Sequence, residues 1–130
     1  MKFTEREMTV AVDAVAQKLY AGSRPPWRKG SAEDAWAELG KFEKYQHRAA
    51  AGEVVLTPLL ALPERPTVGA TPEFSQEEYR AAAESGGQVE SLEGKKRERF
   101  IAMTAQLTKY AVEAMPIRQD PDALIVPDHL

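Results

Sequence analysis

Residues 100–115 read FIAMTAQLTKYAVEAM, and this stretch decides the fold of the chain. Its apolar and small side chains recur three and four residues apart, which places them on one side of a helix. They are Phe100, Met103, Thr104, Leu107, Tyr110, Ala111, Ala114 and Met115. Pro116 ends the helix, because proline has no amide hydrogen to continue the hydrogen-bond ladder. We expect the other helices to pack on this one.

Two further helices carry a capping box, in which a side chain at the helix start and a carboxylate three residues later satisfy each other's backbone amides. Thr4 and Glu7 have this spacing and predict a helix at about residues 5–21. Ser75 and Glu78 repeat it and predict a helix at 76–85. The helix that contains residues 100–115 is expected to begin near Ser91 and to cover 92–115.

Ser31 is a typical N-cap, and the residues after it predict a helix at 32–51, ended by Gly52. We expect its inner side to include Trp36, Phe42 and Ala49, which recur at helical spacing.

Residues 53–72 contain an apolar run and several prolines, and we interpret them as a crossover lying against the bundle. Thr57 and Pro58 are typical of the start of a short helix. The alternative is a strand at residues 54–56, although no partner strand is evident.

These patterns predict an all-α protein, a small bundle of four main helices in a single domain over residues 1–130. Residues 116–130 form an extended C-terminal tail in this interpretation. The tail contains the apolar run Leu124, Ile125 and Val126, which needs to dock on its own bundle or on a partner chain.

Composition narrows the class of protein. The 130 residues include no cysteine, which excludes disulfides and thiolate chemistry. No apolar run approaches the roughly 18 residues that a membrane span needs, and the N-terminus lacks the apolar core of a signal peptide. We therefore expect a cytoplasmic protein with no membrane association, metal or cofactor.

Catalytic signals are weak. His47 follows Glu43 by one helical turn, a spacing that could orient a histidine base, but a histidine paired within its own helix is the simpler interpretation. The serines at 31, 75 and 91 are accounted for as helix caps, and no nucleophile elbow or phosphate-binding loop occurs. The sequence favours a protein that is not an enzyme.

Two basic segments raise nucleic-acid binding as an alternative function. Arg24, Arg28 and Lys29 flank Trp27, whose ring could stack on a base while the cations contact phosphates. The second segment comprises Lys95, Lys96, Arg97 and Arg99. The net charge of −3 argues against a protein whose main role is to bind phosphates.

Apolar residues that a small bundle does not readily bury favour a different function. They include Val10, Trp27, residues 59–62 and the tail run 124–126. A second protein chain can cover such residues, so the sequence predicts a non-catalytic protein-interaction module. The first candidate partner is a second copy of the chain, forming a homodimer.

Overall fold

A computed structural model of the chain describes residues 1–65 and 67–118. Within these ranges the secondary structure is entirely helical, which confirms the all-α prediction. The elements are α1 (Glu5–Ser23), α2 (Ala32–Glu38), α3 (Lys41–Ala61), α4 (Gln76–Glu84), the 3-10 helix η1 (Gly87–Ser91) and α5 (Gly94–Ala114). The helices predicted at 5–21, 76–85 and 92–115 lie within two residues of these bounds. No helix in the described part of the chain is long and apolar enough to cross a bilayer.

The prediction of a single helix at 32–51 is wrong. The helix is interrupted at Leu39 and Gly40, and a second helix then runs from Lys41 to Ala61. Leu39 and Gly40 are both extended, and Gly40 serves as the N-cap of α3. Glycine is poor in a helix interior and acceptable at an N-cap, so the break falls where it costs least.

The crossover predicted at 53–72 is wrong over its first half. Residues 53–61 continue α3, so residues 54–56 are not a strand, and the helical structure predicted after Thr57 and Pro58 is part of this long helix rather than a separate short one. A proline there removes one helical hydrogen bond. The helix continues because Ala51, Val55 and Leu59, spaced four residues apart, are fully buried on one side of it. Burial of that side outweighs the local stop signals of Gly52 and Pro58.

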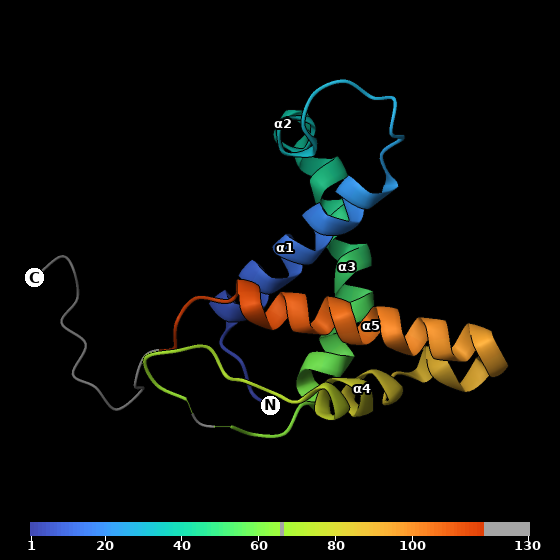
Figure 1. The fold of residues 1–130 in the computed structure, drawn as a ribbon. Helices are drawn as coiled ribbons and strands as arrows, with labels where there is room; N and C mark the ends of the chain where they lie inside the picture. The colour runs from blue at the N-terminus through green and yellow to red at the C-terminus, as the bar shows by residue number, and fades with distance from the viewer. Residues whose placement is uncertain (66, 119–130) are drawn as a thin grey trace, which may run out of the picture.

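Figure 1 shows α1 beside α3 and α5 crossing both of them. α4 packs on α5 and on α3, while α2 contacts α1 at the other end of the molecule. The result is a base, formed by α4, α5 and the adjoining parts of α1 and α3, from which an arm projects. The arm consists of α2, the loop at residues 24–31 and the neighbouring ends of α1 and α3 (Figure 1).

The main core lies where α1, α3 and α5 meet. Its buried members are Met1, Ala11, Val15, Ala16, Trp36, Ala51, Val55, Leu59, Leu62, Tyr79, Ala82, Leu107, Ala111, Val112 and Met115. The buried side of α5 differs in part from the predicted stripe: Ile101 and Thr108 are buried, whereas Met103 and Tyr110 are exposed. The apolar residues of α5 cover so wide an arc of the helix that their spacing did not fix which part of that arc faces the core.

Ion pairs attach the long loop before α4 and the segment that follows α5 to the base. Arg65 donates two hydrogen bonds to the Glu78 carboxylate, at 2.9 and 2.8 Å, and so fastens the chain at Arg65 to the start of α4. The Glu7 carboxylate, buried at the start of α1, has its Oε2 atom 3.1 Å from Nε of Arg118. The Arg118 backbone also pairs with Gly69 and Ala70.

The assignment of α3 predicts opposite outcomes for two adjacent leucines. Leu59→Ala should lower the free energy of unfolding by about 2–5 kcal/mol, because Leu59 is fully buried. Leu60→Ala, at an exposed position, should change it by less than about 0.5 kcal/mol. Urea denaturation followed by circular dichroism measures both. Equal losses for the two variants would contradict the face of α3 described above.

Acid stability should report the ion pair between Arg65 and Glu78. Hydrogen bonding from Arg65 and from the Ser75 backbone lowers the pKa of Glu78 from 4.5 to about 2. A carboxyl with a lowered folded-state pKa stabilises the fold above pH 4.5, and this contribution is lost as pH falls from 4.5 towards 2. Glu78→Gln keeps the capping-box geometry but removes the charge.

The melting temperature of the wild type should therefore exceed that of Glu78→Gln at neutral pH, and the difference should shrink across that acid window. Glu77→Gln, one residue earlier in the same turn, is the control and should show a smaller difference at neutral pH. A wild-type advantage over Glu78→Gln that is independent of pH would mean that the ion pair is not the cause.

Candidate interaction surface

Large apolar side chains line the outer side of α3. At 100° per residue, Phe42, Tyr45, Ala49, Leu56 and Leu60 fall within an arc of about 60° on the helix surface. We call these five residues the α3 stripe. The stripe runs almost the full length of α3, from the arm to the base.

The α3 stripe is exposed. Phe42, Tyr45 and Leu60 retain 69%, 66% and 60% of their accessible surface, and Leu56 retains 39%. Ala49 is also exposed. Because α1, α4 and α5 all pack on other sides of α3, an apolar face of several adjacent side chains remains open to solvent. Contiguous exposure of this kind is typical of an interaction surface rather than of scattered surface residues.

The centre of the α3 stripe is flat. Gly52, next to the stripe, lies beneath Leu56, whose Cδ1 atom is 3.3 Å from the position that a Cβ atom of Gly52 would occupy. The Leu56 side chain therefore lies along the helix. With Ala49 one turn earlier, this leaves a low region between the aromatic end and the leucine end of the stripe, whose surface is formed by Ala49 and by the flat Leu56 side chain that covers the buried Gly52.

Three aromatic rings, one each from α1, α2 and α3, pack together in the arm and join these helices. The Trp36 ring of α2 lies 5.6 Å from the Tyr20 ring of α1 and 5.8 Å from the His47 ring of α3. Tyr20 and His47 are also in contact, with ring centroids 5.2 Å apart. His47 is thus part of the arm's packing, and Glu43, its predicted carboxylate partner, is exposed.

Trp27 lies in the loop at residues 24–31 of the arm, and at 79% it is the most exposed large apolar residue in the described part of the chain. The Arg24 guanidinium donates to the backbone carbonyls of Lys29 and Gly30, at 3.3 and 3.5 Å, so it closes this loop rather than facing a ligand. Arg28 and Lys29 are exposed beside Trp27.

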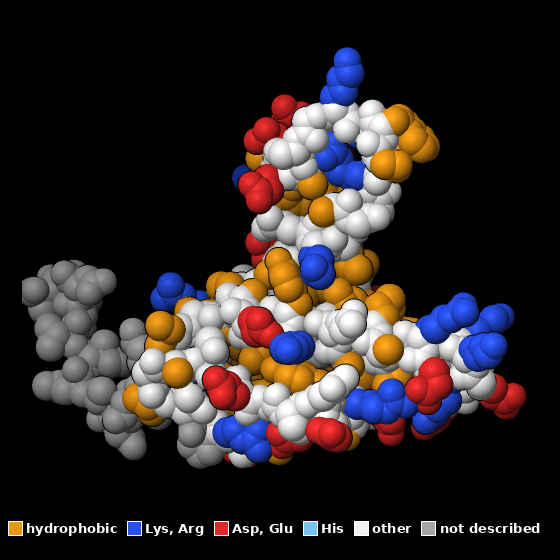
Figure 2. Space-filling model, viewed as in Figure 1, with side chains coloured by type: hydrophobic (Ala, Val, Ile, Leu, Met, Phe, Trp, Pro, Cys, Tyr) orange, Lys and Arg blue, Asp and Glu red, His pale blue; other side chains and the backbone are white. Residues whose placement is uncertain are grey.

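The second basic segment lies at the start of α5, at the outer end of the base (Figure 2). Lys95, Lys96 and Arg99 are exposed, whereas Arg97 donates to the Val89 carbonyl at 3.1 Å. Figure 1 shows this end of α5 well away from the loop at residues 24–31. The two basic segments therefore do not form one surface.

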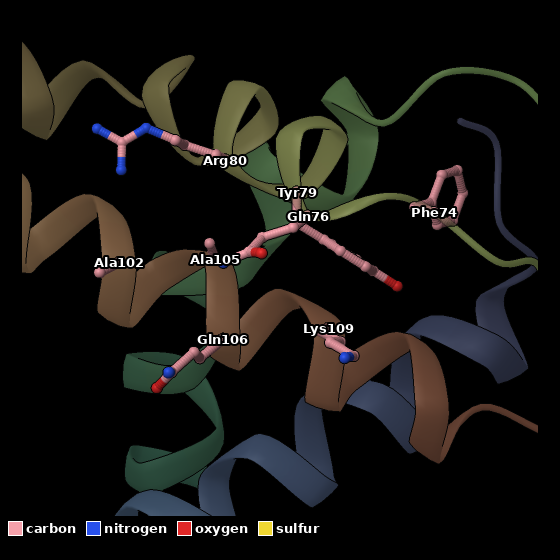
Figure 3. A pocket seen from close by; sticks show the side chains of 8 residues that line it. All are labelled: Phe74, Gln76, Tyr79, Arg80, Ala102, Ala105, Gln106 and Lys109. Atoms are coloured by element: carbon pink, nitrogen blue, oxygen red, sulfur yellow. The ribbon is translucent and has the colours of Figure 1, made fainter.

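A groove of about 370 Å³ lies between α4 and α5 on the base (Figure 3). Arg80 and Gln76 of α4 and Gln106 and Lys109 of α5 supply its polar atoms, and Phe74 and Tyr79 supply aromatic surface. Arg80 is already bound by Glu84 and Glu98, with closest atoms 3.3 and 2.6 Å apart. Burial, with Glu113 and Glu78 nearby, raises the pKa of the Tyr79 hydroxyl to about 12, so this group stays neutral at physiological pH.

The described residues were compared with the side-chain arrangements that bind metal ions. Within residues 1–65 and 67–118, no group of three or more histidine, aspartate or glutamate side chains is arranged to hold a metal ion. The tail residues Leu124, Ile125 and Val126 lie outside the described part of the chain.

Sequence reasoning missed the α3 stripe, since it assigned Phe42 and Ala49 to the inner side of the second helix. A signal for the stripe is present in the sequence. One apolar series contains residues 42, 45, 49, 56 and 60, and a second contains residues 51, 55 and 59 on a different side of the same helix. Two apolar series on one helix indicate two packing surfaces, of which the bundle buries one.

Comparison with protein-family models, with curated proteins and with solved structures found no match to this chain. The functional proposal therefore rests on the geometry of the α3 stripe.

Proposed function

We propose that the protein is an interaction module that binds another polypeptide through the α3 stripe and performs no chemistry of its own. The observation that carries the proposal is the exposed apolar face along nearly the whole of α3. Four of its five residues are large apolar side chains, and two of these are aromatic. Aromatic side chains are enriched at the centres of protein interfaces, and tyrosine is among the residue types that contribute most of the binding energy.

Rigidity of the arm supports this proposal. The packed rings of Tyr20, Trp36 and His47 fix α2 and α1 against the first half of α3. The ion pair between Asp13 and Arg48, with closest atoms 2.6 Å apart, adds a second tie between α1 and α3. Little conformational entropy is then lost when a partner binds, because the surface is already in its binding conformation.

Nucleic-acid binding, the alternative predicted from sequence, has less support. The two basic segments are separated, and Arg24 and Arg97 are both used in internal hydrogen bonds. The α3 stripe is apolar, and this favours a polypeptide partner over phosphates.

Site-specific photo-crosslinking tests the proposal inside cells that express the protein. Replacing Tyr45 with p-benzoylphenylalanine places a reactive aromatic group in the α3 stripe with little change in shape. We expect a discrete protein adduct after irradiation. Leu56→Glu in the same chain should reduce the adduct about tenfold, because an unpaired carboxylate in an apolar interface costs more than 1.4 kcal/mol.

Tyr110 of α5 is the matched control position, since it is also an exposed tyrosine but lies off the stripe. The same replacement there should give no discrete adduct. If positions 45 and 110 gave the same pattern, or if Leu56→Glu left the adduct unchanged, the α3 stripe would not be the binding surface.

A further inference from the structure

We propose that the partner of the α3 stripe is a second copy of this chain, and that two α3 helices pair antiparallel about a two-fold axis near Ala49 and Gly52. This inference rests on the proposed function, because it names the occupant of the same surface.

The order of side-chain sizes along the stripe is the first argument. Large residues stand at both ends, Phe42 and Tyr45 at one and Leu56 and Leu60 at the other, and small residues lie in the middle. The sequence is therefore nearly symmetric in size about residue 51. When two α3 helices lie side by side in antiparallel orientation, Phe42 of one comes opposite Leu60 of the other, and Tyr45 comes opposite Leu56. A two-fold interface requires such self-complementarity, and a surface for an unrelated partner does not.

The middle of the stripe allows close approach. Ala49 of one copy comes opposite the Gly52 region of the other, where Gly52 is buried and the Leu56 side chain lying flat over it forms the surface. Small residues at a crossing point let two helix axes come within about 8 Å, which is the near end of the range for packed helices. The large side chains on either side can then interdigitate.

Three features favour the antiparallel over the parallel arrangement. Antiparallel helices oppose their dipoles, whereas parallel helices align them. Antiparallel pairing also places aromatic rings on leucine side chains, so bulky rings do not meet each other. Finally, α3 runs from the narrow arm to the wide base (Figure 1), and turning one copy around places each base beside the partner's arm.

Charges at the edges of the stripe are compatible with this pairing. Arg48, at one edge, is already neutralised by Asp13 of its own chain. Glu53, at the other edge, is exposed and comes opposite Ala49 of the second copy in a pairing centred on residue 51, so it lies beside the apolar centre rather than within it. The centre of the stripe carries no charged side chain.

Sedimentation velocity of the purified protein tests whether a second copy binds. We expect the sedimentation coefficient to rise from monomer to dimer between about 1 and 100 μM. Ala49→Glu should weaken dimerisation at least tenfold. Ala50→Glu is the matched control, because Ala50 is also exposed but lies 100° further round α3. It should leave dimerisation unchanged.

Disulfide trapping tests the antiparallel register. The natural chain has no cysteine, so an introduced cysteine is the only one present. A mixture of Phe42→Cys and Leu60→Cys proteins should form a mixed disulfide dimer under mild oxidation. Phe42→Cys alone should not, since the two residues 42 are roughly 27 Å apart along an antiparallel pair and a disulfide needs Cα atoms within about 7 Å. Ala81→Cys on α4 is the control for random collision.

The outcomes separate the two proposals. A protein that stays monomeric at 100 μM, both whole and without residues 119–130, overturns the second-copy inference. In that case a Tyr45 adduct to a different protein would still support the proposed function. Dimerisation gained only on removal of residues 119–130 would mean that the tail occupies the stripe, and it also overturns the inference. Efficient trapping of Phe42→Cys alone would replace the antiparallel register with the parallel one.

Discussion

Burial of one side of α3 is the constraint on which the rest of the structure depends. Ala51, Val55 and Leu59 are fully enclosed by α1, α4 and α5, and their burial keeps the helix intact through Pro58. Because the helix is not interrupted there, it is 21 residues long and reaches from the base into the arm. The same continuity aligns Phe42 and Tyr45 with Leu56 and Leu60 on a second side of the helix, about 110° round from the buried one. The core of the protein thus determines the geometry of its candidate binding surface.

Helices with strong local signals could be predicted from the sequence. The capping boxes at Thr4 and Ser75 place α1 and α4 correctly because both partners of each box lie within four residues. The all-α class follows from these signals and from helical periodicity. Such features require no knowledge of which elements pack together.

α3 could not be placed in the same way because its local and tertiary preferences conflict. Gly52 and Pro58 are stop signals at the level of sequence, and only the buried contacts of Val55 and Leu59 override them. The side of α3 that faces the core is also not determined by the sequence pattern. α3 carries apolar residues on two sides, and periodicity alone does not say which side faces the core. Phe42 and Ala49 were assigned inward for that reason, although they face solvent.

The proposed contact that unites these features is the antiparallel pairing of the α3 stripe with the α3 stripe of a second copy of the chain. Isotope-filtered NMR on a mixture of ¹³C-labelled and unlabelled protein measures this directly, because it records only contacts between copies. Antiparallel pairing predicts cross-peaks between the Phe42 ring of one copy and the Leu60 methyl groups of the other. Absence of all intermolecular cross-peaks to the stripe at concentrations of about 100 μM or more would contradict it.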